Sequence, residues 1–264
     1  MIPMPELPDV ESFRRYLAYT SLHKKIVKVH LPGKELISGI TATTLRRHLL
    51  GRVLNRTERH GKHMFAGTDA GEWLLLHFGM TGFLKYYRDE DGEPGHPRLI
   101  LDFDNGYHLA YDDRRKLGRI GLVMDIDGYI ERRNLGPDAL GIDLETFLEV
   151  YEDRRGAVKS ALMDQSAVAG IGNIYADEIL FQAGINPGTR MAELDDDAME
   201  RLFRNMNKVL KKAVECGAKP DCLPDSYLIP NRTKGGTCPE CGREVTRTKV
   251  SGRTTYYCPC RQGG

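Results

Sequence analysis

All six cysteines of this 264-residue chain lie after residue 215, and four of them form the close pairs Cys238-x-x-Cys241 and Cys258-x-Cys260. Between the pairs, two strand-like runs flank Ser251-Gly252, a combination typical of a tight hairpin turn. Two thiolate pairs brought together by a hairpin can close a tetrahedral zinc site. The second pair is one residue shorter than the usual Cys-x-x-Cys, and four free or oxidisable cysteines are the alternative. The spacing predicts a zinc-bound hairpin with all four cysteines as ligands.

The remaining cysteines, Cys216 and Cys222, are expected to be ordinary thiols. A disulfide framework is normally spread along a small secreted chain, whereas this clustering favours metal binding in a reducing compartment. The chain has no run of about 18 apolar residues that could span a membrane. Its first residues lack the basic and then apolar segments of a secretion signal. We therefore expect a cytoplasmic protein without membrane contact.

The hydrophobic pattern changes character along the chain. Apolar residues recur at helical spacing near the start and predict a helix over residues 6–21. Residues 24–124 contain short strand-like runs separated by turn signals, the pattern of a β-sandwich or barrel. Helical periodicity then predicts helices over 144–151, 158–163 and 173–183 and a longer one ending before Gly217. We expect an α+β multidomain chain in the order helix, β domain, helical domain and metal-binding tail.

The charge distribution points to a partner that the net charge does not reveal. The net charge is only +1, from 38 basic and 37 acidic residues. Residues 232–264, however, contain seven Lys and Arg against two Glu, a local charge of 7 − 2 = +5. A local basic module on a neutral chain is typical of a DNA- or RNA-binding tail.

The opening stretch Met4-Pro5-Glu6-Leu7-Pro8 sets a proline beside a carboxylate. A proline at a free amino terminus is a secondary amine with an α-amino pKa of about 8, and it can attack a sugar carbon to form a Schiff base. Glu6 could then donate or accept a proton. The alternative is that Pro5 only occupies the first turn of a helix, where its missing N–H costs nothing. Because residues 1–4 would block the proline nitrogen, the chemical interpretation requires translation to start at Met4 and that methionine to be removed.

Three further motifs admit both a chemical and a structural interpretation. The glycine-rich turn at 170–176 precedes a helix and can admit a phosphate to backbone N–H groups, although such glycines are commonly just a turn. Met80, in the loop after an apolar strand, is either an exposed side chain or part of the core. The loop 113–118 places three cations beside Leu117, which suits insertion into a base stack or a solvated basic loop.

Together these motifs resemble the formamidopyrimidine-DNA glycosylase / endonuclease VIII family of base-excision repair enzymes. The resemblance implies a catalytic domain over residues 1–130, with an N-terminal helix and a β-sandwich. It further implies a helix–two-turns–helix DNA-binding domain over 131–227 and a zinc finger over 228–264. The expected form is a monomer with one structural Zn²⁺, with damaged double-stranded DNA between the two main domains. The matching motifs run in order from Pro5 to Cys260 and include 5–11, 77–82, 113–118, 135–137, 162–165 and 170–176.

The resemblance also implies an activity. The chain would excise oxidised bases as a bifunctional DNA glycosylase and abasic-site lyase, with β- and δ-elimination after base loss. Pro5 would be the Schiff-base nucleophile, Glu6 would protonate the sugar, and Lys62 would assist proton transfer or contact phosphate. Arg253 would grip the phosphates flanking the lesion and aid strand cleavage. The other implied DNA contacts are Met80, Arg115 and Leu117 in the gap left by the flipped base, Lys159 and Asn173 at phosphates, and His96 and Arg155.

Departures from the family pattern keep alternatives open. Leu117 stands where many relatives have phenylalanine, and the segment after Gly217 lacks the longer base-capping loop of 8-oxoguanine-specific members. Endonuclease VIII-like specificity for pyrimidines or hydantoins is therefore an alternative to 8-oxoguanine and formamidopyrimidine. A second alternative is a catalytically inactive damaged-DNA-binding protein with a blocked N-terminus. A third is a zinc-ribbon nucleic-acid adaptor in which Pro5 and Glu6 are purely structural.

Overall fold

The computed structural model describes residues 5–263 of the chain. Their contacts separate two compact units, of which the first comprises Pro5 and Asp9–Arg133. The second comprises Glu6–Pro8 and residues 134–263. The predicted translation start at Met4 lies outside the described residues.

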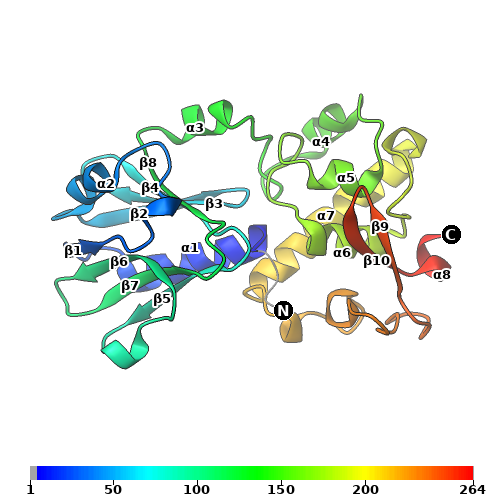
Figure 1. Ribbon diagram of the computed structural model, residues 1–264. Coiled ribbons are helices and arrows are strands. Elements are labelled where there is room, and N and C mark those ends of the chain that lie inside the picture. Colours follow the sequence, from blue (N-terminus) through cyan, green and yellow to red (C-terminus); the bar gives the residue numbers. More distant parts are fainter. Residues whose placement is uncertain (1–4, 264) are drawn as a thin grey trace. The chain divides into compact units, whose positions relative to one another are not determined.

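The first unit is a β-sandwich with a helix before it (Figure 1). α1 (Leu7–Ser21) confirms the helix expected over residues 6–21. Two four-stranded antiparallel sheets have the strand orders β1-β6-β7-β5 and β2-β3-β4-β8, so the β domain is a sandwich and not a closed barrel. The strands are β1 (Ile26–His30), β2 (Leu54–His60), β3 (His63–Thr68), β4 (Trp73–His77), β5 (Gly82–Tyr87), β6 (Pro97–Phe103), β7 (His108–Asp113) and β8 (Arg119–Val123).

Residues of both sheets and of α1 share one buried core. Val10 and Leu17 of α1 are fully buried and belong to the same cluster as Leu74 of β4 and Leu101 of β6. Burial alternates along β6, as a strand with one face on a core requires. The helix therefore uses its apolar stripe to complete the sandwich core.

The strand-like texture of residues 24–124 did not predict α2 (Ala42–Leu49). The Thr41 hydroxyl caps this helix by accepting a hydrogen bond from the Thr44 N–H at 3.1 Å. Leu45 and Leu49 lie four residues apart, on one helical face, and both are fully buried. The remaining short helices are α3 (Ile126–Arg132), η1 (Lys34–Leu36), η2 (Glu90–Gly92), η3 (Met191–Glu193), η4 (Pro220–Cys222) and η5 (Ile229–Asn231).

The second unit contains the predicted helices and the predicted hairpin. α4 (Leu144–Tyr151), α5 (Val158–Met163) and α6 (Asn173–Ala183) have the expected bounds. The longer helix, α7, runs from Asp196 to Glu215 and is capped by the side chain of Asp195. The hairpin and the last turn are β9 (Thr246–Val250), β10 (Arg253–Tyr257) and α8 (Pro259–Gln262).

α6 separates two buried clusters in this unit. Leu180 packs into the helical core with α7, whereas the next residue, Phe181, packs against Val245 and Cys258, which flank the two strands of the hairpin. Both Leu180 and Phe181 are fully buried. A helix that is apolar around most of its circumference is one that is covered on every side. α6 is thus the element on which both the helical core and the hairpin are built.

The prediction that Cys216 and Cys222 are ordinary thiols is wrong. The structure joins them by a disulfide, with their Cα atoms 5.4 Å apart. The chain turns back after α7 at Gly217, whose φ is +60°, and the η4 turn brings Cys222 beside Cys216. The pairing depends on this reversal, which the cysteine spacing alone does not show.

Candidate active site

The Glu6 carboxylate lies at the amino terminus of α6 and is almost completely buried, with 1% exposure. Its Oε2 accepts hydrogen bonds from the N–H groups of Gly172 at 2.7 Å and Tyr175 at 3.3 Å. Its Oε1 accepts one from the Ile174 N–H at 2.8 Å. Backbone donors at the positive end of a helix favour the ionised form of a carboxylate. Three backbone hydrogen bonds therefore hold the Glu6 carboxylate in place and favour its ionised form.

The glycine-rich turn makes room for the first residues of the second unit. A Cβ atom on Gly172 would lie 2.3 Å from Cδ of Glu6, and one on Gly170 would lie 2.4 Å from Cδ1 of Leu7. The Leu7 N–H also donates to the Gly170 carbonyl at 3.1 Å. The anion at this helix terminus is thus the Glu6 carboxylate, where the sequence left a phosphate or a plain turn as the alternatives.

Pro5 directly precedes Glu6 and is itself buried. Lys62, the other predicted proton-transfer residue, follows Gly61 in the turn between β2 and β3. Gly61 has a φ of +54°, which a tight turn of this kind requires. The positive charge of Lys62 contributes to the low pKa of His77, so the two side chains are electrostatic neighbours.

The three residues predicted to enter the DNA stack come from two loops that touch. Asp113 organises them, because its Oδ1 accepts from the Thr81 hydroxyl at 2.6 Å and from the Arg115 N–H at 3.2 Å. Its Oδ2 accepts from the Gly118 N–H at 2.8 Å, and the residue is fully buried. Asp113 thus ties the loop carrying Arg115 and Leu117 to the residue that follows Met80.

Gly79 allows these loops to approach. A Cβ atom at this position would lie 2.5 Å from the carbonyl carbon of Leu117, and its φ is +55°. Leu117 remains 48% exposed on the far side of this contact, and Met80 is partly exposed. The structure therefore places Met80, Arg115 and Leu117 on two loops that contact each other.

The other predicted DNA contacts differ in their accessibility. Arg253, Arg155 and His96 are exposed. Asn173 is partly exposed, and its Nδ2 donates to the Thr254 carbonyl at 3.0 Å. Lys159 is only 1% exposed and is ion-paired with Asp177 at 2.7 Å. A buried, paired lysine is a poor candidate for a surface phosphate contact.

Three of the four predicted zinc ligands lie together. The sulfurs of Cys238, Cys241 and Cys258 are all within 4.8 Å of one another. Cys260 is exposed and outside this group, and its sulfur accepts a hydrogen bond from Nη1 of Arg243 at 3.1 Å.

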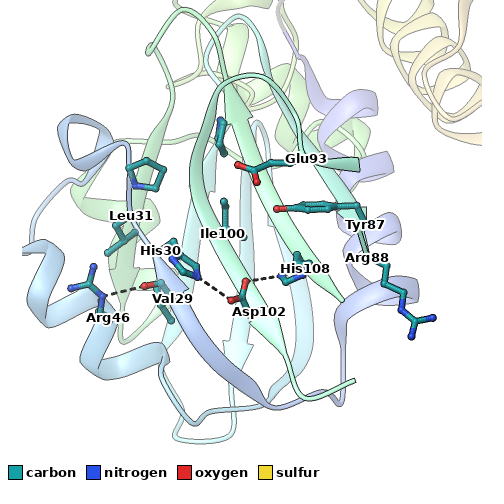
Figure 2. Close-up of a pocket in the computed structure, with 12 residues that line it drawn as sticks. Val29, His30, Leu31, Arg46, Tyr87, Arg88, Glu93, Ile100, Asp102 and His108 are labelled. Carbon is teal, nitrogen blue, oxygen red and sulfur yellow. Dashed lines mark hydrogen bonds and ion pairs between the residues drawn. The ribbon is translucent and has the colours of Figure 1, made fainter. Parts of the chain in front are cut away.

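A cavity of 670 Å³ lies in the first unit, on the face of the β1-β6-β7-β5 sheet opposite the core. Figure 2 shows His30 and His108 on either side of Asp102, whose carboxylate accepts hydrogen bonds of 2.9 and 2.7 Å from them. Burial acts to raise the pKa of Asp102, but these two hydrogen bonds outweigh it and lower the pKa. Among the described residues that line this cavity, none belongs to the predicted site.

A second histidine pair lies beside Lys62. The rings of His63 on β3 and His77 on β4 have centroids 4.9 Å apart. Burial, together with the neighbouring charges, lowers the pKa of His63 to about 3 and that of His77 to about 4. Both imidazoles are therefore neutral at physiological pH.

Lowering the pH from 7 to 5 is expected to destabilise the protein through His63 and His77. Both have pKa values below the 6.5 of an unperturbed histidine, so the unfolded state binds protons first as the pH falls. This stability is complete above about pH 6.5 and is lost toward pH 4, with a loss of about 2 kcal/mol for each histidine, or about 4 kcal/mol combined, at pH 5. Urea titrations at both pH values should show a smaller loss in a His63→Gln/His77→Gln variant.

The matched control is His23→Asn, an exchange of an exposed histidine whose φ is +62°, a conformation that asparagine tolerates. It should leave the pH dependence unchanged. An identical pH dependence in the wild type and the double variant would contradict the assignment.

Two successive parts of the chain match the models of known protein domains. Residues 4–120 match the model of the formamidopyrimidine-DNA glycosylase N-terminal domain, and residues 135–221 match that of its H2TH domain. The formamidopyrimidine-DNA glycosylase of Laribacter hongkongensis is 32% identical over 98% of this chain and 100% of its own length. That of Streptococcus pyogenes is 31% identical over 97% and 98%, respectively.

Solved structures with the same fold contain damaged DNA. A Lactococcus lactis Fpg complex with DNA containing an abasic site has a TM-score of 0.89, at 27% identity over 98% of this chain and 100% of that one. A complex of the same protein with DNA containing N7-benzyl-Fapy-dG has a TM-score of 0.88 at 28% identity. Among the described residues, none of the helices has the length and apolar character needed to cross a membrane. The β-sandwich, the buried Glu6, the cysteine cluster and these similarities show that the chain belongs to the formamidopyrimidine-DNA glycosylase family.

Proposed function

We propose that this protein excises oxidised bases from duplex DNA and then cleaves the strand, with the nitrogen of Pro5 as the nucleophile. The observation that carries the proposal is the buried Glu6 carboxylate, which three backbone N–H groups fix directly after Pro5. Relatives over the full length of the chain are formamidopyrimidine-DNA glycosylases, and similar structures hold DNA with an abasic site or a Fapy-dG derivative.

In the proposed reaction, the Pro5 nitrogen forms a bond to C1′ of the damaged nucleotide while the bond from C1′ to the base breaks. The base leaves with the bonding electrons and takes up a proton. Glu6, held as an anion, accepts the proton that the amine loses and returns it to the sugar ring oxygen as the ring opens. The resulting iminium acidifies the adjacent C2′–H, so β-elimination of the 3′ phosphate and then δ-elimination of the 5′ phosphate can follow.

Extrusion of the damaged nucleotide has to be compensated by side chains that fill the stack. Unstacking a base costs a few kcal/mol, and an inserted side chain recovers part of that cost. Exposed Arg115 and Leu117, with partly exposed Met80, have the apolar and cationic character for this role. Exposed Arg253, with Arg155, His96, Asn173 and Lys62, would supply the phosphate contacts.

Borohydride trapping on DNA tests the proposal directly. A protein whose chain begins at Pro5 should give a covalent adduct with a duplex containing 8-oxoguanine or an abasic site, and should cleave the strand. Absence of any adduct, with lesion binding retained, would support the binding-only alternative instead. A panel of oxidised purines and pyrimidines in the same assay separates the two specificity alternatives.

The cysteine group fits a structural zinc ion. A tetrahedral zinc with bonds of about 2.3 Å to sulfur places its ligands about 3.8 Å apart, which is compatible with the spacing of Cys238, Cys241 and Cys258. Arg253 lies at the turn of the β9–β10 hairpin, and zinc would hold together the opposite, open end of that hairpin. Cys260 as the fourth ligand stays a prediction, as do the monomeric state, the three domain ranges and the cytoplasmic location.

Metal analysis is expected to find one zinc per chain, lost in Cys258→Ser. Loss of the metal removes the link between the two ends of the hairpin, so DNA binding and trapping should fall with it. Cys216→Ser, outside the cluster, is the matched control and should retain the zinc. Purified protein with no zinc near 1:1 would exclude the site, and zinc retained in Cys260→Ser would show that another group completes it.

A further inference from the structure

The ammonium group of Lys159, which the sequence placed at a DNA phosphate, is held by three partners inside the protein. Its Nζ lies 2.7 Å from Oδ1 of Asp177, 2.7 Å from the hydroxyl of Thr255 and 3.1 Å from the carbonyl of Thr254. Two of these contacts are hydrogen bonds and the one to Asp177 is an ion pair. With 1% of the residue exposed, Lys159 is inaccessible to a phosphate in this structure.

Asp177 joins this lysine to two more parts of the same unit. Its Oδ2 accepts from Nε of Arg232 at 2.8 Å and from the Tyr256 N–H at 3.1 Å. The Arg232 guanidinium also lies over the Tyr256 ring, 5.0 Å from its centroid. The Asp177 carboxylate is fully buried, so it can contact no DNA.

Lys159 and Asp177 hydrogen-bond to β10, the strand that begins with Arg253. Thr254, Thr255 and Tyr256, the next three residues of β10, all receive contacts from Lys159 or Asp177. Arg253 itself is exposed, and its side chain has no hydrogen-bond or ion-pair partner within residues 5–263. At the hairpin tip, the Ser160 hydroxyl donates to that of Ser251 at 2.7 Å.

We propose that the buried ion network of Lys159, Asp177 and Arg232 positions the β9–β10 hairpin so that Arg253 can reach DNA. Lys159 and Asp177 are then positioning residues that act through Arg253. The inference rests on the proposed phosphate contact of Arg253. In this proposal Lys159 makes no phosphate contact itself and instead contributes to DNA binding through the position of Arg253.

A double-mutant cycle distinguishes the indirect role from the direct one. The dissociation constant for a duplex with an abasic-site analogue is measured against salt concentration in Arg253→Ala, Asp177→Asn and the combined variant. Each lost phosphate contact lowers the slope of log K against log salt by about 0.9. Asp177→Asn should weaken binding and lower the slope as Arg253→Ala does. In the Arg253→Ala background it should change neither the slope nor the dissociation constant by more than about twofold.

Lys159→Met provides the second arm. If the lysine bound a phosphate itself, Lys159→Met would lower the slope by a further 0.9 or so in the Arg253→Ala background, and that result would overturn the proposal. A wild-type slope in folded Asp177→Asn would also overturn it. Because removing one partner of a buried ion pair is strongly destabilising, Lys159→Met/Asp177→Leu, which leaves neither charge of that pair, replaces any single variant that does not fold.

Glu178→Gln is the matched control. Glu178 is the next residue of α6 and is also fully buried, but its carboxylate accepts from the Ile229 N–H at 2.7 Å and from Gln182 at 2.8 Å, away from β10. It should alter stability and leave the salt slope unchanged. Failure of the proposed function would appear separately, as wild-type protein that gives no borohydride adduct, because the cycle measures binding alone.

Discussion

Replacing Glu6 by glutamine is expected to lower the rate of base excision by a factor of about 100 or more, the usual contribution of a positioned proton-transfer group. Glutamine keeps the size of the side chain but cannot accept the proton that Pro5 must lose. Its NH₂ group would also face one set of the N–H donors that now bind the two carboxylate oxygens. The measurement is single-turnover excision on a duplex with one lesion, at a temperature well below unfolding.

The control for this variant has to separate lost chemistry from a lost helix cap. Asp195→Ala serves, because the Asp195 carboxylate caps α7 through the Ala198 N–H at 2.8 Å and belongs to no predicted site. It should lower the stability by about 1 kcal/mol and leave the excision rate unchanged. A folded Glu6→Gln protein with the wild-type rate would show that Glu6 is only a cap, as the adaptor alternative requires.

A chain that retains Met4 before Pro5 is expected to give no borohydride adduct and no strand cleavage. The proline nitrogen is then part of an amide, whose lone pair is delocalised and cannot attack C1′. A chain that begins at Pro5 carries a secondary amine with a pKa of about 8, so a useful fraction is uncharged at neutral pH. Intact mass and trapping, measured on the same two samples, give the comparison.

An adduct formed by the blocked protein would contradict the role of Pro5. Peptide mapping of that adduct would then identify the amine that reacts, with Lys62 as the first candidate because it was predicted to act in proton transfer. DNA binding by the blocked protein should persist, since the exposed cations do not depend on the terminal amine. Equal amounts of borohydride adduct from the chain that retains Met4 and the chain that begins at Pro5 would favour Lys62 as the nucleophile.

Features with local causes were predictable from the sequence. α5 and α6 have the expected bounds because the signals that define them lie within a few residues of each other. These signals are the apolar spacing of both helices and the left-handed Gly184 that ends α6. The hairpin around Ser251-Gly252 and the grouping of Cys238, Cys241 and Cys258 follow from short spacings in the same way.

Other features were not predicted, whether their causes are local or lie in distant segments. α2 was hidden by the surrounding strands, and the Cys216–Cys222 disulfide depends on a chain reversal at Gly217. Asp113 carried no signal beyond a charged loop, yet it orders the group of Met80, Arg115 and Leu117. Composition and periodicity contain no information on which carboxylate accepts a hydrogen bond from which backbone N–H.

The sequence by itself determined the family pattern, the order of the elements and the residue types at each position of the site. Only the tertiary structure decided what two of those residues touch. The Glu6 carboxylate accepts a hydrogen bond from the N–H of Gly172, 166 positions away in the sequence, so the glycine-rich turn binds a carboxylate of the same chain. Lys159 donates a hydrogen bond to the hydroxyl of Thr255, 96 positions away in the sequence, and is buried where a surface cation was expected. Burial and hydrogen bonding arise from packing between distant segments, so neither outcome could be derived from local residues.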